Sequence, residues 1–108
     1  MELNEYQSKA VSTAIYPEDF KVFYPALGLA GESGEVANKV KKIIRDDDGI
    51  VTKSQKQDVG KEIGGCLWYI AALAHDLGLN LSDIAKENLD ILESRRERGV
   101  LQGSGDNR

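Results

Sequence analysis

The sequence predicts an all-α fold: a chain of four helices that form a helical bundle completed by oligomerisation. Apolar residues recur every three or four positions in the long segments, as the buried face of a helix requires. Helix-capping signatures and polar or glycine-containing breaks separate the segments, with little competing strand pattern. The 108 residues fit a single domain, 1–108, whose small helical core is expected to be completed by a second copy.

The first helix is predicted from about Glu5 to Ile15. Asn4 is positioned to cap it, with Gln7 three residues later as the reciprocal partner of a capping box. The second helix is predicted over 25–45, because proline is favoured in the first turn of a helix. The polar turn at 46–49 then breaks the pattern.

The third helix has the clearest signals. Thr52 and Gln55 form a capping box at its start, and Gly78 ends it. Its predicted inward face carries six apolar residues, Val59, Ile63, Cys66, Ile70, Leu73 and Leu77.

The fourth helix is predicted from a Ser82 cap to about Arg96. Its predicted inward residues are Ile84, Leu89 and Leu92. The glycine-rich tail, 99–108, has no periodicity and is predicted to be a loop.

Composition and charge exclude several classes of protein. The net charge of −4 argues against a nucleic-acid binder that relies on a basic face. The longest apolar stretch, 64–74, is too short to span a membrane, and the N-terminus has no signal-peptide pattern. The single cysteine has no disulfide partner, which favours a reducing compartment. We therefore expect a cytoplasmic protein that binds neither nucleic acid nor membranes.

Three acidic residues border the predicted apolar faces. Glu32 and Glu35 share a face of the second helix, and Glu62 borders the core side of the third. Unpaired charges there are costly, whereas hard divalent cations such as Mg²⁺ take oxygen ligands of this kind. In the alternative interpretation the acids lie on a solvated rim and pair with Lys39, Lys41 or Lys42.

Glycines beside the acids favour the metal interpretation. Five of them lie in the two helices, at 28, 31, 34, 64 and 65. Each costs on the order of 1 kcal/mol in a helix interior relative to alanine. Such a cost is typical of positions where a backbone closely approaches another helix or a ligand.

Three runs of the chain form a set of motifs: YPALGLAGESGEV at 24–36, KEIG at 61–64 and LWY at 67–69. Together they resemble the MazG-like nucleotide pyrophosphohydrolases of the all-α NTP pyrophosphatase superfamily. The tail at 98–108 looks like the ending of a small single-domain subgroup. The resemblance covers nearly the whole chain and is specific as a set, because Glu-x-x-Glu alone is a weak signal.

The resemblance implies hydrolysis of a nucleoside triphosphate to its monophosphate and pyrophosphate, with Mg²⁺ as cofactor and Mn²⁺ able to substitute. The family's metal motif is Glu-x-x-Glu, a spacer, then Glu-x-x-Asp. Glu32, Glu35 and Glu62 match three of these positions and are the expected metal ligands and catalytic residues. The fourth position falls on Gly65, which has no side chain. A purine deoxynucleotide is the working expectation for the substrate, although no residue selects the base.

Other residues are expected to bind the nucleotide. The phosphate candidates are Lys39, Asn88, Arg95, Arg98 and Arg108, of which Asn88 matches a family position near the metal and phosphates. Free N–H groups of the tail are a further candidate cradle for phosphate. Tyr69 lies on the stripe of Glu62 and is the candidate for contact with a base or ribose. In the alternative interpretations, the lysine and the arginines are solvated surface residues and the tail is a frayed terminus. Tyr69 then packs at a subunit interface.

Gly65 leaves three interpretations open. The site works with fewer ligands, or another acid substitutes, or the protein is a nucleotide binder that has lost most catalysis through a natural or engineered substitution. Candidate substitutes are Asp58, Asp83 and Asp90, with Asp58 one turn before Glu62. A different class of function, a helical partner-binding module without a nucleotide role, predicts no thermal shift with nucleotide and metal. The residues do not choose between a homodimer and a tetramer.

Overall fold

A computed structural model of the chain describes all of its residues, 1–108. It contains four α-helices and no strand: α1 (Leu3–Val11), α2 (Phe23–Asp47), α3 (Lys53–Asp76) and α4 (Leu81–Glu97). A short 3₁₀-helix, η1 (Glu18–Phe20), which was not predicted, lies between α1 and α2. The predicted all-α class and the number of α-helices are confirmed. None of the four helices combines the length and apolar character needed to cross a membrane.

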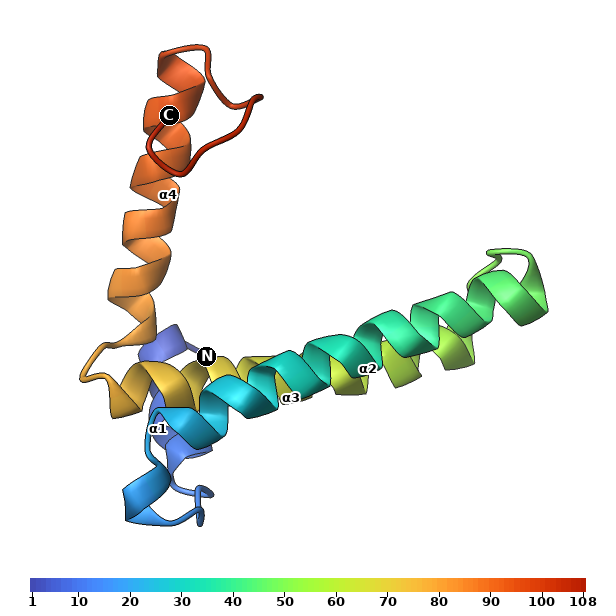
Figure 1. Cartoon of the computed structure of the whole chain (residues 1–108), viewed down its shortest axis with the longest axis horizontal. Coiled ribbons are helices and arrows are strands. Elements are labelled where there is room, and N and C mark those ends of the chain that lie inside the picture. The colour runs from blue at the N-terminus through green and yellow to red at the C-terminus, as the bar shows by residue number, and fades with distance from the viewer.

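The helices form two arms that meet at an elbow (Figure 1). The long helices α2 and α3 pack side by side as a hairpin, and α1 packs against α3 near the elbow. Helix α4 contacts α1 and then extends away from the hairpin, with the tail folded back at its outer end. The four helices therefore do not form a closed bundle within one chain, and completion of the bundle by oligomerisation stays a prediction.

The core at the elbow is small and built largely from alanine. Ala10 of α1, Ala71 and Ala74 of α3 and Leu81 of α4 form its buried cluster. Partly buried Tyr6 and Trp68 pack against that cluster. Alanine side chains let helix backbones approach closely, which explains how such a short α1 can hold α3 and the start of α4 together.

The predicted capping box of Asn4 and Gln7 is wrong. Helix α1 begins at Leu3, two residues earlier than predicted, and Glu2 precedes it without a side-chain cap. Gln7 is buried instead, and its amide oxygen accepts a hydrogen bond of 3.1 Å from the backbone N–H of Leu81. Asn4 accepts from the N–H of Ser82 at 3.0 Å. Both side chains thus satisfy free N–H groups at the start of α4, a role that local sequence spacing does not reveal.

The other helix ends follow their local signals more closely. Thr52 and Gln55 form the predicted capping box of α3. Gly78 has φ of +74°, and the N–H of Leu79 bonds to the carbonyl of Ala74, as in a glycine-terminated helix. The predicted Ser82 cap is wrong, because the side chain of Asn80 accepts from the third residue of α4.

Much of the apolar surface predicted to face inward is exposed in the single chain. Ile63 is 55% exposed, Leu77 53% and Leu89 64%, so their predicted burial is wrong for one chain. The physical reason is that α4 meets the hairpin only near its own start and then extends away, so most of the apolar face of the hairpin stays uncovered. The chain exposes 7899 Å², whereas a compact monomer of 11.9 kDa exposes about 6,000 Å². Its radius of gyration is 16.8 Å, against about 13 Å for a compact domain of this length.

Candidate acidic site between helices α2 and α3

Two of the three predicted acids meet across the seam of the hairpin. Glu32 lies on α2 and Glu62 on α3, and their carboxyl groups are neighbours across the seam. Hydrogen bonding with the neighbouring Glu62 carboxyl, followed by burial and the nearby negative charges of Glu62 and Glu35, raises the pKa of the Glu32 carboxyl above its ordinary value. Two carboxylates held near each other repel, so the pair favours a positively charged partner.

Glu35 and Gly65 border this pair in different ways. Glu35 is exposed, and it acts on Glu32 through its charge. Gly65 lies against Glu32, because a Cβ atom at position 65 would lie 2.6 Å from Oε2 of Glu32. The position that the family resemblance assigns to a fourth carboxylate is thus next to the pair and filled by the carboxyl of Glu32.

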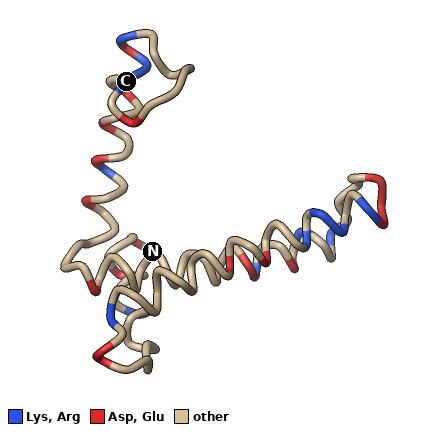
Figure 2. The backbone as a smooth tube through the Cα atoms, viewed as in Figure 1, with Lys and Arg blue, Asp and Glu red and all other residues tan.

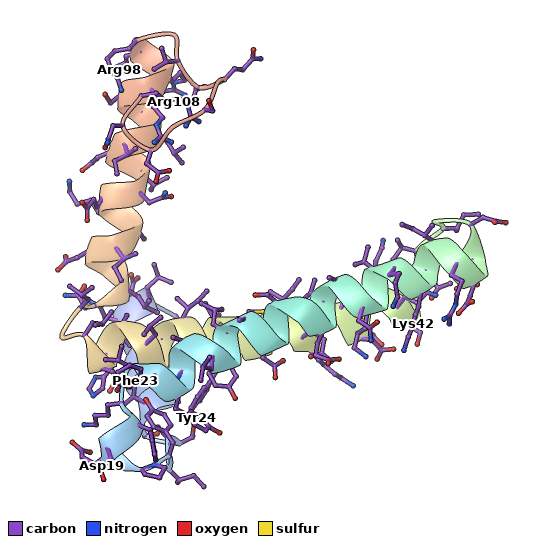
Figure 3. The ribbon with its side chains drawn as sticks, in the orientation of Figure 1. Asp19, Phe23, Tyr24, Lys42, Arg98 and Arg108 are labelled. Atoms are coloured by element: carbon purple, nitrogen blue, oxygen red, sulfur yellow. The ribbon has the colours of Figure 1, made fainter.

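Lys39 adds a positive charge to the site. Its Nζ lies 3.6 Å from Oε1 of Glu62, and both side chains are partly exposed. This ion pair is one that the alternative, solvated-rim interpretation also predicted. The remaining members of the lysine group lie further along α2, and Lys42 is on the outer part of the hairpin (Figure 3).

A groove of about 200 Å³ continues outward from Lys39 between α2 and α3. Its lining includes Lys39, Lys42 and Asp58, the last of which is the predicted substitute ligand. Asp47 in the same groove accepts a hydrogen bond from Gln55. Figure 2 shows the basic segments of the hairpin lying outward of its acidic middle. Lys42 was not among the predicted site residues, although its position three after Lys39 places both on one helix face.

Aromatic residues close the opposite, elbow-side end of the acidic site. Tyr16 stacks on Tyr24 with ring centroids 4.8 Å apart, and Trp68 meets Tyr69 edge-on at 5.1 Å. The Tyr69 ring lies against Gly28, where any Cβ atom would overlap it. Burial first, then Tyr24 and Glu32, raise the pKa of the Tyr69 hydroxyl. The close approach predicted from the glycines is therefore confirmed at position 28.

Two members of this aromatic group, Tyr16 and Trp68, use their polar atoms in hydrogen bonds that hold the elbow together. The Tyr16 hydroxyl donates to Asp76 at 2.7 Å, and the same carboxylate accepts from the backbone N–H of Val22 at 2.9 Å. Trp68 Nε1 donates to the Thr13 hydroxyl at 2.8 Å. Tyr69 is the member influenced by the charge of Glu32, and Tyr24 lies beside it with ring centroids 6.3 Å apart. Tyr24 also starts the run on which the family resemblance rests.

The remaining phosphate candidates lie on the other arm of the molecule. Asn88 and Arg95 belong to α4, and Arg98 and Arg108 lie at its outer end (Figure 3). Within one chain these residues do not approach the acidic pair, because α4 extends away from the hairpin. Asp83 and Asp90, the other predicted substitute ligands, are on α4 as well.

The tail uses the arginines internally. The Arg108 guanidinium donates to the backbone carbonyls of Val100, Leu101 and Gly105. Arg95 donates to the carbonyl of Asp106 at 2.8 Å, and Arg98 donates to the carbonyl of Arg108. The tail is therefore a loop, as predicted, and these hydrogen bonds fold it back onto the end of α4.

The donor set of the acidic pair fits a hard divalent cation. No group of three or more His, Cys, Asp and Glu side chains converges in the chain, so two carboxylates form the centre of the candidate site. Glu32 Oε2 lies against Gly65, one helical turn after Glu62, so oxygen donors from two packed helices are next to each other. Mg²⁺ is commonly held by one or two carboxylates, with water and substrate phosphates completing its shell.

Comparisons with known proteins point to one family. Residues 25–100 match the family model described as the MazG nucleotide pyrophosphohydrolase domain. The chain is also 47% identical over 114 aligned positions to the "Gene 37 protein" of Mycobacterium phage L5, and the alignment covers 100% of both sequences. No solved structure matches the chain. The matched family range includes the acidic pair, Lys39, Tyr69 and all of α4.

Proposed function

Because the chain belongs to the MazG nucleotide pyrophosphohydrolase family, we propose that it is a metal-dependent enzyme that converts a nucleoside triphosphate and water to the monophosphate and pyrophosphate. The observation that carries this proposal is the Glu32–Glu62 carboxyl pair across the α2–α3 seam, with Lys39 beside it. A purine deoxynucleoside triphosphate is the proposed substrate. Glu32, Glu35 and Glu62 are the proposed catalytic centre.

Glu32 and Glu62 would hold the cation, with Glu35 adding negative charge at the rim. A bound Mg²⁺ or Mn²⁺ neutralises phosphate oxygens and makes water a better nucleophile. The carboxylates lie on two packed helices, so they bring oxygen donors to the phosphates with little loss of conformational entropy. Lys39 supplies a further positive charge within reach of the same phosphates. Asp58, one helical turn before Glu62 on α3, is the proposed substitute ligand.

The two ends of the site suggest the direction in which the nucleotide lies. Tyr69 and Tyr24 offer aromatic surface and hydroxyl groups at the elbow end. Lys39 and Lys42 offer positive charge at the outer end. We propose that the base and ribose lie against the tyrosines and that the phosphates point along the seam toward the lysines.

A second copy of the chain is proposed to complete the protein. The surface exposed beyond that of a compact monomer is about 1,900 Å², within the range that one subunit buries in an obligate dimer. In this arrangement a partner's α4 would cover the apolar face of the hairpin. It would bring Asn88 and Arg95 toward the acidic pair, which one chain does not do.

Sedimentation equilibrium tests the association. We expect a dimer or a tetramer at micromolar concentration, because burial of so much apolar surface stabilises association strongly. A monomer over this concentration range would contradict the proposed assembly and the composite site with it.

The enzyme proposal is tested with a panel of NTPs and dNTPs in the presence of Mg²⁺ or Mn²⁺. The expected product is pyrophosphate and not orthophosphate, with the largest rate on a purine dNTP. If no substrate yields pyrophosphate, even with Mn²⁺, the proposed pyrophosphohydrolase activity is refuted.

Gly65 specifically favours a second candidate, a nucleotide-binding protein with weakened catalysis. This candidate predicts no pyrophosphate release but a higher melting temperature with nucleotide and metal. A ligand at about 100 times its Kd stabilises the folded state by roughly 2.7 kcal/mol, which a melting curve resolves. A helical partner-binding module predicts neither result.

A further inference from the structure

Gly65 holds a space that the Glu32 carboxyl fills. A Cβ atom at position 65 would lie 2.6 Å from Oε2, 3.0 Å from Cδ and 3.4 Å from Cγ of Glu32. Atoms in folded proteins do not approach so closely, so a side chain at 65 and the present position of Glu32 exclude each other. At the adjacent Gly64, by contrast, a Cβ atom would meet nothing within 4 Å.

We propose that Gly65 is a positioning residue: by lacking a side chain, it lets Glu32 reach Glu62 across the seam, so that these two carboxylates hold a single divalent cation. The inference rests on the proposed function for the presence of a cation. In this proposal the glycine at position 65 strengthens cation binding through Glu32, whereas the lost-ligand interpretation has it weaken the site. Here the carboxyl of Glu32 takes the place next to Glu62 that an acid at position 65 would otherwise occupy.

The charges near the pair support one cation rather than two. Two carboxylates neutralise the charge of one divalent ion. The ammonium group of Lys39, 3.6 Å from Glu62, already adds positive charge beside them. A second cation in the same space would have only the exposed Glu35 as an additional carboxylate. One carboxylate would not compensate the repulsion of this second cation by the first cation and by Lys39.

The test is a titration of the full chain with Mn²⁺, followed by electron paramagnetic resonance, for the wild type, Gly65→Ala and the matched control Gly64→Ala. We expect one Mn²⁺ per chain in the wild type and in the control, with similar affinity. Gly65→Ala should bind at least about 10-fold more weakly, because displacing the ligand Glu32 should cost at least as much as loss of a ligand's supporting group, which is 10- to 100-fold. Both variants should melt no lower than the wild type, because alanine favours the helix and the Glu32 side chain can turn away.

A double-mutant cycle keeps the test decisive and checks that Gly65 acts through Glu32. In the Glu32→Gln background, which has no Glu32 charge to position, adding Gly65→Ala should cause no further loss of Mn²⁺ affinity. An undiminished effect in that background would overturn the inference, and so would equal affinities of Gly65→Ala and Gly64→Ala. Two ions per wild-type chain would overturn the single-cation site.

The outcome for this inference separates from that for the proposed function. If the wild type releases pyrophosphate but Gly65→Ala does not change the Mn²⁺ affinity, the proposed enzymatic activity is supported and the positioning role of Gly65 is overturned. If the Mn²⁺ affinities of the wild type and the variants are as expected but no pyrophosphate is released, the positioning role is supported and the proposed enzymatic activity is refuted. Absence of Mn²⁺ binding in the wild type, with and without a non-hydrolysable triphosphate, would overturn both.

Discussion

Replacing Glu62 by Gln is expected to lower pyrophosphate release by at least about 100-fold, since loss even of a ligand's supporting group commonly costs 10- to 100-fold. The amide keeps the size of the side chain but removes one of the two facing negative charges. It also leaves Lys39 without its ion-pair partner, 3.6 Å away in the wild type. The measurement is the steady-state rate of pyrophosphate release on the best substrate of the panel, with Mg²⁺ and with Mn²⁺.

The matched control for Glu62→Gln is Glu5→Gln. Glu5 is exposed on α1, where it pairs with Lys9 at 2.9 Å, away from the acidic pair. Its replacement removes the same charge and is expected to leave the rate within a factor of about two, because exposed helix pairs contribute little. A Glu62→Gln enzyme that retained a rate close to that of the control would contradict the assignment of Glu62 to the catalytic centre.

The largest effect on stability is expected from Gln7→Leu. The Gln7 side chain is buried and makes three hydrogen bonds: its amide donates to the carbonyls of Ala71 and Leu79, and its oxygen accepts from the N–H of Leu81. Leucine preserves much of the volume but leaves a buried donor and acceptor without partners. We expect a loss of about 2 to 4 kcal/mol in the free energy of unfolding, from two such groups.

Urea denaturation at one fixed protein concentration measures this loss, because association contributes to the apparent stability. Gln57→Leu is the control, since Gln57 is exposed on α3 and the same substitution there changes no buried hydrogen bond. Equal midpoints for the two variants would show that the Gln7 network does not hold α1, α3 and α4 together.

Local chemistry was sufficient to predict most of the secondary structure. The capping box at Thr52, the glycine stop at Gly78 and the polar turn after α2 are interactions between residues close in sequence, so their patterns predict helix ends directly. Asn4 and Gln7 show where this fails. Their spacing fits a capping box, but their hydrogen bonds go to Ser82 and Leu81, more than 70 residues away.

The acidic site was also only partly predictable. Helical spacing predicted that Glu32 and Glu62 border the apolar seam, and they lie together across it. The same spacing could not rank Glu35 against them, because one step around a helix separates a side chain in the seam from one in solvent. Nor could it show that Gly65 faces Glu32, which depends on the alignment of α2 against α3.

By itself the sequence determined four helices, the acids on their apolar borders and the family resemblance, because periodicity, capping and motif spacing are properties of neighbouring residues. Only the tertiary structure decided that Glu32 occupies the space beside Gly65, that Gln7 joins three helices, and that α4 extends away from the hairpin. These features depend on contacts between segments distant in the chain. Their geometry is set by packing and by the partners available to buried polar groups, which no local pattern encodes.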